Sequence, residues 1–154
     1  MISRRDVVQV AHRPGVRLSL IGLILVLLAT GITQAETGER PGPEAVDRGE
    51  KLYNAYCVAC HKPMGVGEPI VPWSIRRTDL IEAMPLNETS HAWHHGDDQL
   101  IVMIHDGTDR SRTRMPVWRN SLSEQNAADL VAFMKSLWSD RIVSCQGPKH
   151  MDCM

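Results

Sequence analysis

The sequence predicts an all-α fold. Several segments of the 154-residue chain carry apolar residues at helical spacing, and loops rich in Pro and Gly separate them. Little of the chain alternates with the two-residue period of a half-buried strand. The chain holds one Phe and two Tyr. A domain of about 100 residues with so few of these large side chains can form only a modest apolar core.

Residues 1–35 have the pattern of a secretory signal. An apolar run, 18–32, follows a basic leader, and Thr33-Gln34-Ala35 supplies the small residues that precede a cleavage site, so we expect cleavage after Ala35. The leader contains Arg4, Arg5, Arg13 and Arg17. The apolar run is shorter than the ~20 residues that a spanning helix prefers, and an uncleaved anchor is the alternative.

Removal of the leader leaves a net charge of about −4 with His neutral. This charge gives no general basic surface for nucleic acid. Residues 36–43 are polar and rich in Pro and Gly, which indicates a linker before the folded domain.

The first helix is expected from Pro43 or Glu44 to the residues before Cys57, with Pro in its first turn. Its apolar positions follow helical spacing. Gly49 lies inside this helix, where glycine is costly unless another element packs closely against it.

Three further helices are expected. A short one covers about 78–84, and another covers about 97–105 and ends before Gly107. The last begins at Ser123 and carries one broad apolar face. That face consists of Leu130, Phe133, Met134, Leu137 and Trp138.

Cys57-Val58-Ala59-Cys60-His61 predicts covalent attachment of a c-type haem. Each thiol can form a thioether with one haem vinyl group, and the neutral imidazole of His61 can bind the iron. The alternatives are a redox CxxC, half of a zinc site and a structural disulfide. A redox CxxC needs a βαβ setting, and zinc needs a second ligand pair, for which Cys145 and Cys153 are poorly spaced. We therefore expect a helical domain wrapped around one haem, with a poorly folded apoprotein.

Together these residues resemble a class I c-type cytochrome over residues 44–140. The first helix with Gly49 and Tyr53, then the attachment motif, then a last helix with an aromatic face follow the order of that family. The resemblance implies that the first and last helices cross closely at Gly49. Residues 141–154 extend beyond such a domain as a C-terminal tail.

The second axial ligand of the iron is expected to be a methionine. Met64, Met84, Met103, Met115 and Met134 are the candidates. Met64 is too close to the attachment loop, and Met103 and Met134 are more typical of core residues. The resemblance places the ligand in the loop before the last helix, commonly followed by Pro. Met115-Pro116 fits that description, and Met84-Pro85 is the alternative.

The resemblance also implies that a proline carbonyl accepts the other ring N–H of His61. Pro72 is the expected acceptor, with Pro69 as the alternative. Trp73, Trp93 and Trp118 either line the haem, donate to its propionates or belong to the core.

Two charged or titratable groups have more than one interpretation. The first could neutralise propionates, steer an acidic partner or be a solvated loop. It consists of Arg76, Arg77, Arg110, Arg112 and Arg114. The second is His91, His94 and His95, for which we favour a structural role near the haem edge over a second metal.

In the tail, Cys145 and Cys153 are expected to form a disulfide, as an oxidising compartment favours. The alternative is a copper site, because His150, Met151 and Met154 add further ligands that suit copper.

The predicted function is electron transfer by one haem, in a periplasmic carrier or in the cytochrome subunit of a respiratory complex. Its partners would be a protein donor and a protein acceptor, with membrane association through the N-terminal segment or the complex. Two fixed axial ligands leave no open position for a substrate, so the protein itself is not expected to be an enzyme. The alternatives are a haem enzyme or gas-binding protein with a displaceable ligand, and a haem protein coupled to copper handling by the tail.

Overall fold

The computed structural model describes residues 37–72, 74–75, 82–107 and 115–154. Its α-helices are α1 (Pro43–Tyr56), α2 (Val58–His61), α3 (Asp97–Asp106), α4 (Glu124–Ser136) and α5 (Asp140–Ser144). Three short 3₁₀ helices complete it: η1 (Pro63–Gly65), η2 (Ala92–His94) and η3 (Gly147–Cys153). These residues contain no strand, which confirms the predicted all-α class.

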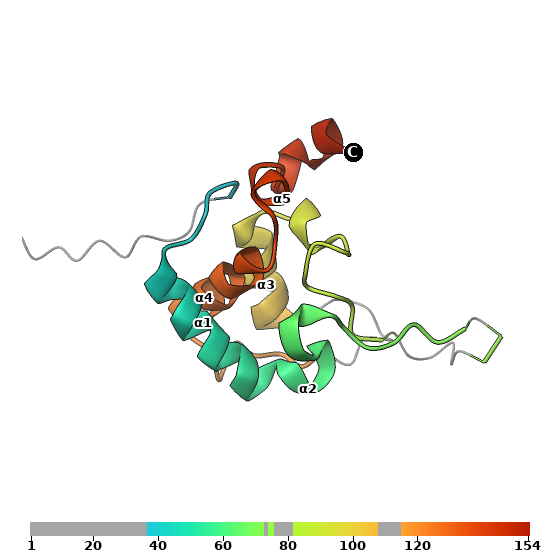
Figure 1. Cartoon of the computed structure of the whole chain (residues 1–154). Helices are drawn as coiled ribbons and strands as arrows, with labels where there is room; N and C mark the ends of the chain where they lie inside the picture. Colours follow the sequence, from blue (N-terminus) through green and yellow to red (C-terminus); the bar gives the residue numbers. More distant parts are fainter. Residues whose placement is uncertain (1–36, 73, 76–81, 108–114) are drawn as a thin grey trace, which may run out of the picture. The chain divides into compact units, whose positions relative to one another are not determined.

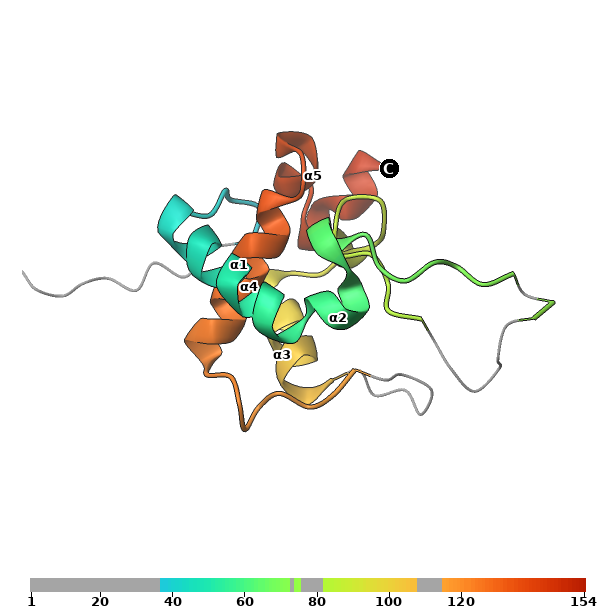
Figure 2. The same ribbon diagram turned by 60° about the horizontal axis from the view of Figure 1, so that its bottom comes forward.

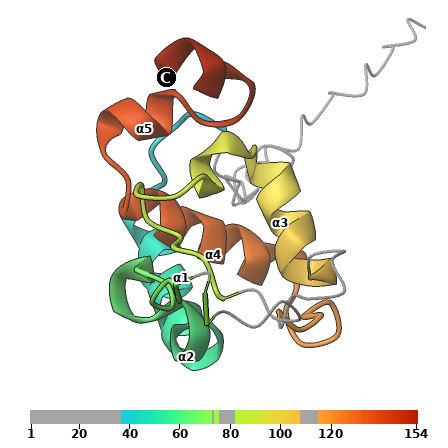
Figure 3. The ribbon, with the colours of Figure 1, turned by 90° about the vertical axis from the view of Figure 1, so that its right-hand side faces the viewer.

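The helices are arranged around α4. Both α1 and α3 pack against α4 (Figures 1 and 2). The segment from α5 to η3 lies at the end of the domain opposite α2 (Figure 3). The apolar core is therefore centred on α4, whose buried residues include Leu130, Phe133 and Met134.

Helix α1 crosses α4 at Gly49, as predicted. A Cβ atom on Gly49 would lie 1.9 Å from the carbonyl oxygen of Asp129 and 2.9 Å from the Cβ of Phe133. One turn later, the ring of Tyr53 lies 4.8 Å from the ring of Phe133, centroid to centroid. The absence of a side chain at Gly49 is what allows the two backbones to approach.

We expect Gly49→Ala to lower the free energy of unfolding of the haem-loaded protein by about 1–3 kcal/mol, the usual cost of overpacking. The added methyl must push α1 away from α4, and this outweighs the better helix propensity of alanine. Asn54→Ala, at an exposed position of the same helix, is the control. Denaturant titration followed by circular dichroism measures both variants. Equal stability of the two would contradict the close crossing.

The ends of α3 and α4 agree with the sequence patterns. The Ser123 side chain accepts a hydrogen bond from the Asn126 backbone N–H, and the Asn126 side chain accepts one from the Ser123 N–H. This reciprocal capping satisfies two of the donors that a helix start leaves without partners. Helix α3 ends at Asp106, directly before Gly107, as the sequence predicts.

The helix expected over 78–84 is not formed in its described part. Residues 82–84 are non-helical, and residues 78–81 lie outside the described residues. Instead Ala83 pairs with Glu68: the Glu68 backbone N–H donates to the Ala83 carbonyl, and the Ala83 N–H donates to the Glu68 carboxylate. Pro85 explains the difference locally, because the residue before a proline is driven out of the α region.

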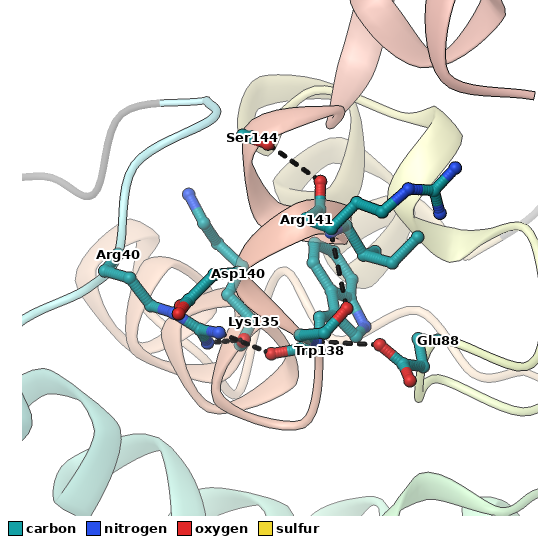
Figure 4. Close-up of polar contacts among 9 residues, drawn as sticks. Arg40, Glu88, Lys135, Trp138, Asp140, Arg141 and Ser144 are labelled. Carbon is teal, nitrogen blue, oxygen red and sulfur yellow. Dashed lines mark hydrogen bonds and ion pairs between the residues drawn. The ribbon is translucent and has the colours of Figure 1, made fainter.

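Residues 37–42, predicted as a linker, are fastened to the domain. The Arg40 guanidinium donates to the carbonyl oxygens of Lys135 and Trp138, at 2.9 and 2.7 Å, and pairs with Asp140 (Figure 4). These carbonyls lie at the C-terminal end of α4, where the helix itself supplies no donors. Arg40 therefore closes the end of α4.

The C-terminal tail packs on the same end of the domain. Ile142 and Val143 of α5 are buried. Cys145 and Cys153 form a disulfide in the structure. The tail is therefore part of the described unit, although the sequence patterns divided it from the cytochrome-like segment.

Within the described ranges, none of the helices has both the length and the apolar character needed to span a bilayer. The apolar run at 18–32 lies outside those ranges.

Candidate functional site

Cys57, Cys60 and His61 occupy one tight turn of backbone. Cys57 ends α1 and begins α2, and its carbonyl oxygen accepts hydrogen bonds from the N–H groups of Cys60 and His61 at 3.2 and 2.9 Å. Both thiols are free; Cys57 is half-buried and Cys60 is exposed. Burial, with a smaller effect from Cys60, raises the pKa of Cys57 to about 11, so this thiol is protonated at neutral pH.

The His61 ring is held in one tautomer by the backbone of a distant segment. Its Nδ1 lies 2.8 Å from the carbonyl oxygen of Met84. A carbonyl only accepts, so Nδ1 carries the proton and Nε2 keeps the lone pair with which an imidazole binds a metal. Burial lowers the pKa of His61, while the Met84 carbonyl and Glu68 oppose that shift. The balance favours the neutral ring that a metal requires.

The acceptor for His61 is thus Met84, and the expectation that it is Pro72 is corrected by this contact. The Pro72 carbonyl accepts from the Ile75 N–H instead. The part of the chain that follows Glu68 leads away from the helices in both views (Figures 1 and 2). Pro85 is the sequence feature that could have indicated Met84 as the acceptor. A residue before a proline favours an extended conformation, so the Met84 carbonyl is not used in a helix and can accept from another group.

Two glycines bring the Met84 segment to His61. Gly67 has φ +75°, and a Cβ on it would lie 2.6 Å from the Pro85 nitrogen. Gly65 has φ +64°, and its carbonyl accepts from the Leu86 N–H at 2.7 Å. Only glycine adopts such conformations readily and leaves room for so close an approach. These two positions were not recognised from the sequence.

Two buried side chains secure this loop to the core. The Tyr53 hydroxyl donates to the Lys62 carbonyl at 2.6 Å, and burial is the main cause that raises the pKa of Tyr53 to about 12. The Trp138 indole N–H donates to the Leu86 carbonyl at 2.8 Å. The neighbouring Ser139 N–H donates to the Glu88 carboxylate, as Figure 4 shows. The Met84 segment is therefore fixed at both His61 and the end of α4.

Met115 lies between α3 and α4, half-buried and packed against the core. The chain continues through Pro116 to Trp118, whose ring lies 5.4 Å from that of Tyr56 in an edge-to-face arrangement. Tyr56 directly precedes Cys57. The Met115 segment therefore approaches the beginning of the attachment turn.

The other predicted residues fall into separate places. Trp93 is buried in the core and Trp118 is half-buried, whereas Trp73 lies outside the described residues. The arginines of interest also lie outside them: Arg76, Arg77, Arg110, Arg112 and Arg114.

The three histidines near η2 are joined by a fourth from the tail. The ring centroids of His91 lie 6.0 Å from His94 and 5.8 Å from His95, and His94 stacks on His150 at 4.5 Å. Burial lowers the pKa of His94, and the neighbouring imidazoles add to that effect. The stacking of His94 on His150 thus joins η2 to η3.

The structure gives no support to the copper alternative. Cys145 and Cys153 are joined to one another, so neither offers a thiolate. Among the residues described, no three or more His, Cys, Asp or Glu side chains are arranged to hold a metal ion.

Comparison with known proteins gives one match. The family model described as cytochrome C oxidase, cbb3-type, subunit III matches residues 44–134, from the first turn of α1 almost to the end of α4. Searches of the curated proteins and of the solved structures gave no match.

Proposed function

Since the chain belongs to the family of cytochrome C oxidase, cbb3-type, subunit III, and is therefore a c-type cytochrome domain, we propose that it transfers single electrons between protein partners through one covalently attached haem. The observation that carries the proposal is the attachment turn. It offers two free thiols beside an imidazole whose tautomer is fixed for metal binding.

The donor set of this turn fits a c-type haem. Cys57 and Cys60 would hold the group through thioethers, and Nε2 of His61 would bind its iron. When bound, the haem supplies an iron centre that gains and loses one electron. The Met84 carbonyl keeps the imidazole oriented and makes it a stronger electron donor.

We assign the second axial position to Met115. The backbone of Met84, the alternative, is bound to the Nδ1 edge of His61. Met84 would therefore support His61, and the second ligand would come from a separate segment. Met115 belongs to a different segment and is partly buried against the core. A thioether ligand raises the reduction potential, as suits a carrier.

The N-terminal pattern supports export to the periplasm or another extracytoplasmic space, where disulfides such as Cys145–Cys153 persist. There the domain would act as a carrier or as the cytochrome subunit of a membrane oxidase, in line with the name of its family. A protein donor and a protein acceptor are its proposed partners.

The ligand assignment is tested with Met115→Leu in the haem-loaded protein. We expect the oxidised wild type to show the weak long-wavelength charge-transfer band of sulfur–iron bonding, and the variant to lose it completely. The reduced variant should also bind carbon monoxide, because its sixth position is open. Met64→Leu, at an exposed position, is the control and should keep the band.

Rapid stoichiometric binding of carbon monoxide to the reduced wild type would contradict the proposal. It would favour a haem enzyme or a gas-binding protein with a displaceable ligand. Retention of the band in Met115→Leu would instead move the assignment to another methionine.

A further inference from the structure

The end of α3 and the Met115 segment are in direct contact. Gly107, the C-cap of α3, has φ +70° and ψ −167°, a region that only glycine adopts without strain. A Cβ atom on Gly107 would lie 3.1 Å from the Met115 carbonyl oxygen. Residues 108–114 lie outside the described residues, but the residues on either side of them meet at this point.

A second set of contacts joins the same two segments at the two residues that precede Gly107. The His105 carbonyl accepts hydrogen bonds from the N–H groups of Trp118 and Arg119, at 2.9 and 3.0 Å. Asp106 pairs with Arg119, whose Nη2 lies 2.6 Å from the carboxylate. We call these five residues, His105, Asp106, Gly107, Trp118 and Arg119, the α3 clasp. The clasp holds the residues that follow Met115 against the last turn of α3.

The clasp also reaches the attachment turn. The Trp118 ring packs edge-on against Tyr56, which directly precedes Cys57. Trp118 is itself packed against the core. One element thus contacts both the segment that bears Met115 and the end of α1 that bears the first attachment cysteine. These contacts connect the two segments that would hold the haem.

We propose that the α3 clasp positions Met115 for bonding to the haem iron, and that Gly107 is the positioning residue on which this depends. The inference rests on the proposed role of Met115 as a ligand. A thioether is a neutral ligand, so its bond to iron depends on a loop that already holds the sulfur in place. A side chain at Gly107 would strain its own backbone and press on the Met115 carbonyl, and on this proposal that is enough to weaken the placement of the sulfur.

A purely structural role for Gly107 makes a different prediction. As a helix C-cap, it would affect the stability of the domain but leave the sulfur–iron bond intact. The test therefore needs a measurement that reports on the bond itself. The long-wavelength band of the oxidised protein and the rate of carbon monoxide binding to the reduced protein are such measurements.

The experiment compares haem-loaded Gly107→Ala and Trp118→Leu with Gly42→Ala. Gly42 has an extended conformation, and a Cβ on it would meet no atom within 4 Å. We expect Gly107→Ala to lose most of the band and to bind carbon monoxide about tenfold faster, the factor that one strained residue can supply. Trp118→Leu, which keeps the backbone bonds but removes the ring contact, should shift both readouts in the same direction. Gly42→Ala should match the wild type.

Met115→Leu separates the two possible failures. If it loses the band while Gly107→Ala and Trp118→Leu keep the wild-type band and rate, the clasp proposal is overturned and the ligand assignment stands. If Met115→Leu keeps the band, the ligand assignment fails and the clasp proposal fails with it. If Gly107→Ala does not retain a folded state, Trp118→Leu alone decides by the same two readouts.

Discussion

Replacing Cys57 and Cys60 together by Ser is expected to abolish covalent retention of haem and, with it, most of the folded structure. Serine keeps the size of each side chain but cannot form a thioether. The described core is centred on α4, and the attachment turn at α2 has no buried residues of its own. A small domain with a modest apolar core is marginal without an additional apolar element.

The measurement is haem content after denaturation and acid extraction, together with circular dichroism of the purified chain. The wild type should keep its haem through denaturation, and the double variant should carry none and show little helix. Cys145→Ser with Cys153→Ser is the matched control: it removes the other cysteine pair and costs a few kcal/mol at most. That control should retain covalent haem. Haem that remains bound to the Cys57→Ser/Cys60→Ser chain through denaturation would contradict the proposed attachment.

Features that depend on neighbouring residues could be predicted from the sequence. The attachment motif is contiguous, and the bounds of α3 and the cap of α4 follow from residues within one turn. The crossing at Gly49 was also accessible, because a glycine inside a helix is costly unless a neighbour needs the space. The disulfide followed from the compartment rather than from geometry.

Features that depend on tertiary contacts could not be predicted in the same way. Pro72 and Met84 both lie in loops after His61, and the acceptor is decided by Gly67, Glu68 and Trp138, which fasten the Met84 segment in place. The described end of the helix expected over 78–84, residues 82–84, is non-helical for a local reason as well, since Pro85 disfavours a helix there. His150 and Arg40 contact partners far away in the sequence, and no periodic pattern marks such contacts.

A buried ion pair is another tertiary contact that the sequence patterns did not predict. Lys135, on α4, is fully buried and lies 2.9 Å from the carboxylate of Asp97, the first residue of α3. The same carboxylate accepts a hydrogen bond from the Gln146 side chain at 2.6 Å. Gln146 also accepts from the Gly38 N–H. The pair therefore connects α3, α4, the tail and the segment before α1.

Because the pair is buried, the loss of one partner should be more costly than the loss of both. Lys135→Met leaves the Asp97 carboxylate buried without a cation, and we expect it to reduce the free energy of unfolding by about 3–5 kcal/mol. Lys135→Met combined with Asp97→Asn should recover part of that loss, since no charge is then left uncompensated.

Denaturant titration of the haem-loaded proteins measures the stability of both variants. Lys51→Met, at an exposed position of α1, is the control and should change stability by no more than about 0.5 kcal/mol. A double variant no more stable than Lys135→Met would show that the cost lies in packing around the Lys135 side chain, not in the unpaired charge. Recovery would instead identify Asp97 as the reason that a lysine is kept in the centre of this small core.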